Sequence, residues 1–190
     1  MTLNDLILKI KIFEGFSSKV YLDSGGTPTI GYGRVDIKSM NETTTKEKED
    51  KWLTEKVSSM YETVRKKMFE WGYYSLSRNQ MLALTDFTYN LGIVNLNKLT
   101  DNGKRDVSTI AEKILLYNKC NRTVLPGLTK RRKWEYDLFT SDTKQYTNAE
   151  TLQIIINEMY KHFEVDKQIE VDGIVGNKTI SACLDIFNLL

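Results

Sequence analysis

The 190-residue sequence is poor in the residues on which metal and thiol chemistry depend. It has one histidine, His162, and two cysteines, Cys120 and Cys183, with no CxxC pair. A zinc site needs about four clustered ligands, so metalloproteases are not leading candidates. The same scarcity of histidine disfavours thiol proteases and serine triads. We expect two free thiols and neither a metal nor a cofactor.

Long apolar runs are also missing. No segment approaches the roughly 20 consecutive apolar residues that cross a bilayer. Residues 1–5 show no basic region leading into an apolar block, so we expect neither a membrane span nor a standard signal peptide. With 41% hydrophobic and 27% charged residues, the chain has the composition of a soluble globular protein and can form a buried core.

The net charge of +2 is unevenly distributed along the chain. Residues 1–140 carry 23 Lys and Arg against 17 Asp and Glu, whereas residues 141–190 carry 4 against 8. This change, together with the polar, aperiodic segment 141–148, predicts a basic domain at 1–140, a linker, and a small acidic module at 149–190. The basic domain suggests an anionic partner, namely a cell-wall polymer, nucleic acid or lipid, although an ordinary solvated surface explains the charge equally well. No recognised nucleic-acid-binding module is present, so we expect no nucleic-acid partner.

The hydrophobic periodicity predicts an α+β chain that is mainly α. Apolar residues recur at helical spacing through most of the sequence, and only the segment 19–35 shows short β-type runs around a turn at 23–26. Thr44-x-x-Glu47 and Ser77-x-x-Gln80 have the pattern of a capping box at a helix start. The predicted helices cover residues 3–14, about 44–68, 77–91, 107–118, 126–139, about 152–160 and 178–188.

Two carboxylates near the N-terminus have the setting of an acid–base pair. Glu14 ends the first predicted helix, where the negative end of the helix dipole and aromatic neighbours favour a neutral, protonated carboxyl group. Asp23 lies in the predicted hairpin turn, and Thr29 offers a hydroxyl that could orient water. One protonated and one ionised carboxyl group is the arrangement that glycoside hydrolysis uses. Each residue alone also fits a structural role at a helix end or in a turn.

Four segments, in order along the chain, resemble the phage-type lysozymes, a family of glycoside hydrolases. The spacing from Glu14 to Asp23 to Thr29 is that of the family's catalytic residues, and the resemblance covers about residues 3–140. The matching residues are Phe13-Glu14-Gly15, Tyr21-x-Asp23-x-x-Gly26 with Thr29-Ile30-Gly31-Tyr32-Gly33, Asn79-Gln80-x-x-Ala83-Leu84-x-x-Phe87-x-x-Asn90-Leu91-Gly92, and Pro126-Gly127-Leu128-x-x-Arg131-Arg132-x-x-Glu135-x-x-Leu138-Phe139.

This resemblance implies a fold and a reaction. The fold is lysozyme-like, with a small N-terminal β-hairpin and a helical body. The reaction is hydrolysis of the β-1,4 bond between N-acetylmuramic acid and N-acetylglucosamine in peptidoglycan, with Glu14 as general acid, Asp23 holding the attacking water and Thr29 positioning it. By position, Tyr32 and Val35 would line the sugar groove, although simple packing of the hairpin explains both residues equally well.

Three arginines bear on this assignment. Either Arg131 or Arg132 pairs with Glu14, or the two form an exposed basic face; the sequence leaves these alternatives open. Arg34 stands where members of the family commonly have histidine. Because the catalytic positions are unchanged, we expect that Arg34 removes a structural or pH-sensitive contact and that the activity is retained.

The acidic module has a motif of its own. Asp172, Gly173, Gly176 and Thr179, with a preceding helix that carries Leu152-Gln153, resemble small peptidoglycan-binding modules built from three helices. The resemblance implies that these four residues bind the cell wall. The alternative is a tight Asp-Gly turn followed by a helix start, with no ligand.

Together these features predict a monomeric phage endolysin that degrades the bacterial cell wall. Such a protein would wait in the host cytoplasm until it is released to the wall, although export by a dedicated secretion machine fits the same sequence. A lytic transglycosylase, which cleaves the same bond without water, and a catalytically idle wall-binding protein are the alternative functions.

Overall fold

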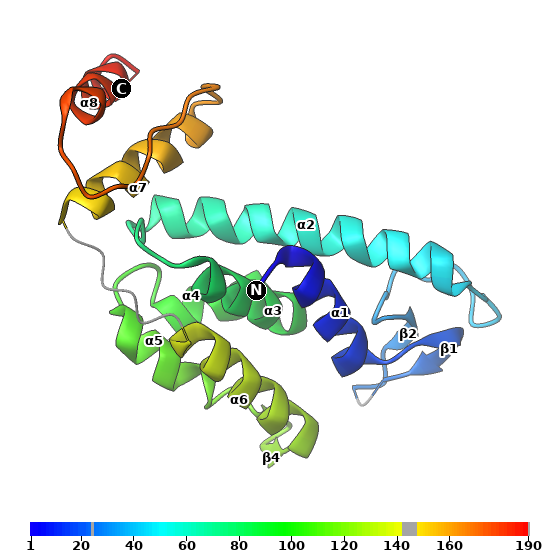
Figure 1. Cartoon of the computed structure of the whole chain (residues 1–190). Helices are drawn as coiled ribbons and strands as arrows, with labels where there is room; N and C mark the ends of the chain where they lie inside the picture. The colour runs from blue at the N-terminus through cyan, green and yellow to red at the C-terminus, as the bar shows by residue number, and fades with distance from the viewer. Residues whose placement is uncertain (24, 142–147, 190) are drawn as a thin grey trace.

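The computed structural model describes residues 1–23, 25–141 and 148–189 and has a mainly helical body followed by two further helices (Figure 1). The mainly α prediction, with a small β element near the N-terminus, is therefore confirmed. The predicted linker at 141–148 falls largely on residues 142–147, which lie outside the described residues. No helix within the described ranges is both long enough and apolar enough to span a membrane.

The N-terminal helix leads directly into a β-hairpin. Helix α1 (Leu3–Glu14) starts at a capping box that Thr2 forms with Asp5, and it ends at Gly15, whose φ of +67° suits glycine. Strand β1 (Ser17–Leu22) then pairs antiparallel with β2 (Pro28–Gly31), with Tyr21 opposite Thr29. Both elements were predicted, and together they carry Glu14, Asp23 and Thr29.

The longest helix, α2 (Lys46–Glu70), begins one residue later than its capping pattern indicates. The side chain of Thr45 accepts the hydrogen bond from the amide of Lys48 and so caps the helix. The hydroxyl of Thr44 instead donates to the buried carboxylate of Glu49, at 2.7 Å. The hydroxyl that the pattern assigned to the cap is therefore bound to a buried carboxylate in the first turns of the same helix.

The centre of the body is α3 (Arg78–Leu91), which packs most extensively on α6 (Pro126–Thr140) and α2. Its predicted capping box, between Ser77 and Gln80, is present. The chain turns at Gly92 into a short helix that was not predicted, α4 (Ile93–Thr100).

Helix α5 (Val107–Ile114) is shorter than predicted, because a second small hairpin follows it. Strands β3 (Lys119–Cys120) and β4 (Thr123–Val124) pair across Asn121 and Arg122, both of which have positive φ angles. A two-residue turn with both φ angles positive matches the twist of a hairpin. Cys120 and Cys183 are free cysteines, as expected.

Two apolar clusters fill the body and position its elements. The larger cluster lies among α2, α3, α4, α5 and α6 and is centred on Phe87. The smaller cluster joins α1 to α2 and α3 and includes Leu6, Ile10 and Leu53, all of them fully buried. Because α1 is fixed on one side and the hairpin follows it at once, the end of α1 is held against the rest of the body.

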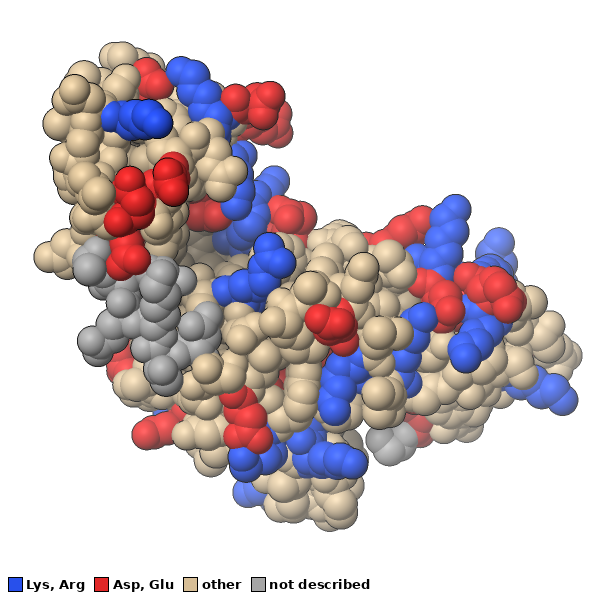
Figure 2. Space-filling view, viewed as in Figure 1, with Lys and Arg blue, Asp and Glu red and all other residues tan. Residues whose placement is uncertain are grey.

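The C-terminal helices form a separate small cluster. Helix α7 (Asn148–His162) packs on α8 (Asn177–Phe187) through Ile156, Tyr160 and Ala182. Helix α7 lies beside the C-terminal end of α2 (Figure 1), where Arg65 pairs with Glu158 at 3.1 Å. On the face shown in Figure 2, basic and acidic side chains are intermixed over the body and do not form one continuous basic patch.

Candidate active site

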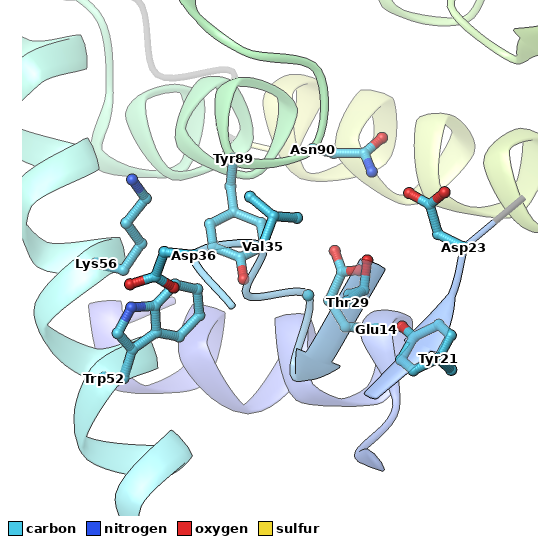
Figure 3. A pocket seen from close by; sticks show the side chains of 11 residues that line it. Glu14, Tyr21, Asp23, Thr29, Val35, Asp36, Trp52, Lys56, Tyr89 and Asn90 are labelled. Carbon is cyan, nitrogen blue, oxygen red and sulfur yellow. The ribbon is translucent and has the colours of Figure 1, made fainter. Parts of the chain in front are cut away.

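A cleft of about 570 Å³ opens beside the first hairpin. The end of α1, the hairpin, the loop after it, α2 and α3 all contribute to its wall (Figure 3). Glu14, Asp23 and Thr29 line this one cleft, so the three residues that the spacing singled out do come together. The other lining residues are Tyr21, Gly33, Val35, Asp36, Trp52, Lys56, Tyr89 and Asn90.

Glu14 is held from behind by a guanidinium group. Its side chain is 20% exposed, and its Oε1 accepts a hydrogen bond of 2.6 Å from Arg131 Nη1. Its Oε2 faces Gly33, because a Cβ placed on that glycine would lie 3.4 Å from this oxygen. One carboxylate oxygen is therefore fixed by Arg131, and the other faces the wall of the cleft.

Arg131 is itself fixed by a buried carboxylate. It donates from Nε and Nη2 to the two oxygens of Asp86, at 2.9 and 2.8 Å, in the bidentate geometry that suits a planar guanidinium. Burial lowers the pKa of Arg131, but Asp86 and Glu14 outweigh that effect and raise its pKa overall. Glu14, Arg131 and Asp86 thus form a chain from the cleft into the core.

Arg132 has a different partner, so the structure selects Arg131 as the residue that contacts Glu14. Arg132 is fully buried and pairs with Glu135 one turn further along α6. Burial, followed by the nearby charge of Asp86, raises the pKa of Glu135 well above its usual range. The alternative of an exposed basic face is wrong for both arginines, because each is less than 5% exposed.

Asp23 and Thr29 are oriented by the backbone of the hairpin turn. One oxygen of Asp23, Oδ1, accepts hydrogen bonds of 2.8 Å from the amides of Gly25 and Thr27. The hydroxyl of Thr29 donates to the carbonyl of Thr27 at 3.0 Å and remains free to accept a hydrogen bond from water. The turn therefore fixes an acceptor carboxylate and an acceptor hydroxyl on the same wall of the cleft.

Of the two predicted groove residues, one lines the cleft and the other is buried in the core. Val35 lines the cleft and is 60% exposed. Tyr32 does not line it, because its ring is 2% exposed and packs in the cluster between α1 and α2. Burial and a hydrogen bond with Asp50 raise the pKa of Tyr32 to about 12. In this structure Tyr32 takes the packing alternative, and contact of Tyr32 or Val35 with sugar stays a prediction.

Arg34 gains contacts where the sequence predicted a loss. Its Nε donates to both oxygens of the fully buried Glu49, at 3.1 and 3.2 Å, and its Nη2 donates to Glu42 at 2.8 Å. Its Nη1 donates to the carboxylate and the carbonyl of Asp36. Arg34 therefore ties the loop that contains Val35 and Asp36 to α2.

Sequence reasoning missed several residues of the cleft. Trp52, Lys56 and Asp36 belong to no motif in the sequence. Tyr89 and Asn90 belong to the segment that resembles the family's central helix, yet only the fold reveals that they reach the cleft. Tyr89 donates to the carbonyl of Tyr32 at 2.8 Å and so supports the hairpin.

Three of the four predicted wall-binding residues of the module, Asp172, Gly173 and Thr179, are hydrogen-bonded to Gln153. The amide group of Gln153 donates to Asp172 Oδ1, to the carbonyl of Ile174 and to Thr179 Oγ1, and its oxygen accepts from the amides of Asp172 and Gly173. Gly176 is the N-cap residue of α8. Thr179 is 3% exposed and stabilises the turn through its contacts with Gln153 and the carbonyl of Ile174. A wall-binding role for these four residues stays a prediction.

No group of three or more His, Cys, Asp or Glu side chains in the described part of the chain is arranged to hold a metal ion. A helical body, a small N-terminal hairpin and an open cleft lined by Glu14 and Asp23 define a lysozyme-like protein. The Phage lysozyme family model matches residues 11–135. The chain therefore belongs to the phage lysozyme family, whose members are muramidases that degrade peptidoglycan.

Similarities to individual endolysins are consistent with this family. The endolysin of Bacillus phage PZA is 30% identical over 161 residues, which are 80% of this chain and 60% of that protein. The endolysin of Acyrthosiphon pisum secondary endosymbiont phage 1 is 28% identical over 142 residues, or 71% of this chain and 94% of that one. The solved endolysin from Escherichia coli O157:H7 phage FAHEc1 superposes with a TM-score of 0.59 at 28% identity, covering 76% of this chain and 98% of that one. This chain thus spans less than two thirds of the length of the Bacillus phage relative.

Proposed function

We propose that this chain hydrolyses the β-1,4 bond between N-acetylmuramic acid and N-acetylglucosamine in peptidoglycan. The observation that carries the proposal is that Glu14, Asp23 and Thr29 line a single cleft in a fold of the phage lysozyme family. A cleft of about 570 Å³ is large enough for several atoms of a glycan chain on each side of the bond.

The three residues have distinct roles in this proposal. Glu14 donates a proton to the glycosidic oxygen from Oε2, because Oε1 is engaged by Arg131. Asp23 accepts a proton from the attacking water, and the free lone pair of Thr29 orients that water. Attack by water on the face opposite the leaving group inverts the anomeric carbon. The anomer released from a defined glycan, followed by NMR immediately after cleavage, tests this assignment, and a retained anomer contradicts it.

The activity itself is tested by counting new reducing ends in purified peptidoglycan. General acid catalysis contributes about 10²–10⁴-fold, so Glu14→Gln and Asp23→Asn should each lose at least about 100-fold in rate without a change in the circular dichroism spectrum. Glu55→Gln is the matched control, because Glu55 is exposed on α2 and does not line the cleft. Unchanged activity in Glu14→Gln contradicts the proposal.

The same experiment separates the alternatives. A lytic transglycosylase releases an anhydro sugar, which is lighter than the hydrolysis product by one water and is recognised by mass spectrometry. Asp23 and Thr29 support hydrolysis, because both are placed to hold water. Binding to walls without release of soluble fragments would indicate a catalytically idle wall-binding protein.

We further propose that residues 149–190 form a module that binds the cell wall, joined to residues 1–140 by the segment 141–148. The separate apolar cluster of α7 and α8 supports an independent unit. Its candidate wall-binding residues are Asp172, Gly173, Gly176 and Thr179. Sedimentation of Glu14→Gln with purified walls, compared with the same variant ending at residue 141, should show weaker binding by the shorter chain; equal binding contradicts the module.

The remaining proposals concern where and in what state the protein acts. We propose a monomer that stays in the host cytoplasm until it is released to the cell wall. Analytical ultracentrifugation measures the oligomeric state. Fractionation of infected or expressing cells measures the location, and enzyme found outside intact cells would favour a dedicated export machine.

A further inference from the structure

At the end of the cleft that α2 lines, two side chains have no role in the proposed hydrolysis. Trp52 and Lys56 are four residues apart and so lie on the same face of the helix, and both line the cleft. Figure 3 shows them with Asp36 at one end, whereas Asp23 and Tyr21 lie at the other, with Glu14 and Thr29 between. This end of the cleft is therefore placed for binding and not for chemistry.

Trp52 presents a rigid aromatic surface there. Part of its ring packs against the cluster between α1 and α2, which fixes its orientation, and part lines the cleft. In the described ranges its indole N–H has no hydrogen-bond partner. A tryptophan with a fixed ring and a free N–H can pack against the C–H face of a pyranose and donate to one of its polar groups.

Lys56 supplies an unpaired positive charge. Its side chain is exposed, and among residues 1–23, 25–141 and 148–189 no carboxylate forms an ion pair with it. Lys11, at the other side of α2, differs because Asp50 binds its ammonium group at 2.7 Å. The ammonium group of Lys56 is therefore available to an acidic group on a molecule bound in the cleft.

The opposite wall of this end is held in place before any ligand arrives. Arg34 binds the carboxylate and the carbonyl of Asp36, each at 3.2 Å, and is itself anchored on the buried Glu49 of α2. The carboxylate of Asp36 is 75% exposed and can accept from a sugar hydroxyl or an acetamido N–H. A preformed wall of this kind reduces the ordering cost of binding.

We propose that Trp52, Lys56 and Asp36 form a subsite for a sugar unit with an acidic substituent, located away from the bond that is cleaved. In peptidoglycan the acidic group is the lactyl carboxylate of a muramyl unit without a peptide, or a carboxylate of the peptide where one is attached. The inference rests on the proposed function and adds to it a preference for muramyl glycans over neutral oligomers of N-acetylglucosamine.

Steady-state kinetics on muramyl oligosaccharides and calorimetric binding of both kinds of glycan test the subsite. Lys56→Gln should raise KM for muramyl oligosaccharides roughly fivefold, the size expected for one exposed ion pair, and leave kcat unchanged. With neutral oligomers, whose binding is followed by calorimetry, the dissociation constant of the same variant should match that of the wild type. Trp52→Phe, which keeps an aromatic ring in the cluster, tests the hydrogen bond from the indole and should weaken binding of both kinds of glycan. Lys51→Gln is the control, because Lys51 is exposed on the same helix but does not line the cleft.

Two outcomes overturn the subsite. One is an unchanged KM for muramyl oligosaccharides in Lys56→Gln, and the other is a dissociation constant that rises equally for neutral and muramyl glycans. Calorimetric binding of muramyl oligosaccharides to Glu14→Gln, with and without Lys56→Gln, keeps this inference separate from the proposed function. If the wild type releases no reducing ends but Lys56→Gln weakens binding about fivefold, hydrolysis is refuted and the subsite stands. If the wild type is active and the dissociation constants are equal, only the subsite is refuted.

Discussion

Replacing Arg131 with methionine removes the positive charge that two carboxylates share behind the cleft. Arg131 is 4% exposed and is bound to Asp86, which is fully buried, and to Glu14. Removal of one partner from a buried ion pair costs about 3–5 kcal/mol, because the remaining charge is left unpaired away from water. Since 1 kcal/mol shifts the unfolding midpoint of a chain of this size by about 2–4 °C, Tm should fall by roughly 6–20 °C.

A second substitution separates stability from activity. In Arg131→Met with Asp86→Leu, both members of the buried pair become apolar, so the free energy of unfolding should return to within about 2 kcal/mol of the wild-type value. Glu14 still lacks the guanidinium that orients it, so the rate of reducing-end release should stay low. Thermal unfolding by circular dichroism measures the first quantity. The reasoning is refuted if the two single effects simply add in the double variant.

Three further predictions concern the framework and the surface. Gly31→Ala should destabilise the protein by about 1–3 kcal/mol more than Gly26→Ala in urea unfolding: both glycines have positive φ, but only at Gly31 would a Cβ collide with the carboxylate of Glu49. Hydrogen bonds from the hydroxyl of Ser108 and from the following turn lower the pKa of Asp106. The Asp106 carboxylate therefore stabilises the folded state above its unfolded pKa near 3.8, and this stabilisation is lost as the pH falls. Because Asp106→Asn lacks the carboxylate, the free energy of unfolding of this variant should fall less steeply between about pH 5 and pH 2. Co-sedimentation of the basic chain with anionic walls should weaken as salt rises from about 0.05 to 0.3 M, and binding that is independent of salt contradicts electrostatic attraction.

Several elements were predictable because their signals are local. The bounds of α1 follow from the periodicity of its apolar residues and from Gly15, and the start of α3 follows from Ser77 and Gln80. These signals act over one or two helical turns, so the rest of the fold does not alter them. The hairpin that carries Asp23 belongs to the same class, because its turn residues specify it.

Local patterns failed where another group competed for a side chain or where the following elements and their packing decided the outcome. Thr44 has the right neighbour for a helix cap, but Glu49 is buried and needs hydrogen-bond donors, so the hydroxyl of Thr44 goes there. The helix predicted at 107–118 ends at Ile114, because the second hairpin follows. Tyr32 sits in the motif that resembles the family, yet the packing of α1 against α2 decides that its ring is buried.

By itself, then, the sequence determined the helical class, the order of the first hairpin and of most helices, and the spacing of Glu14, Asp23 and Thr29, because these depend on residues close together in the chain. Only the tertiary structure decided that Arg131, and not Arg132, contacts Glu14 and that Trp52 and Lys56 complete the cleft. The partners lie far apart in sequence, and the direction of each side chain depends on how α1, α2, α3 and α6 pack. That packing brings two carboxylates and a hydroxyl together with Arg131, which orients Glu14, and with Lys56, which lines the cleft.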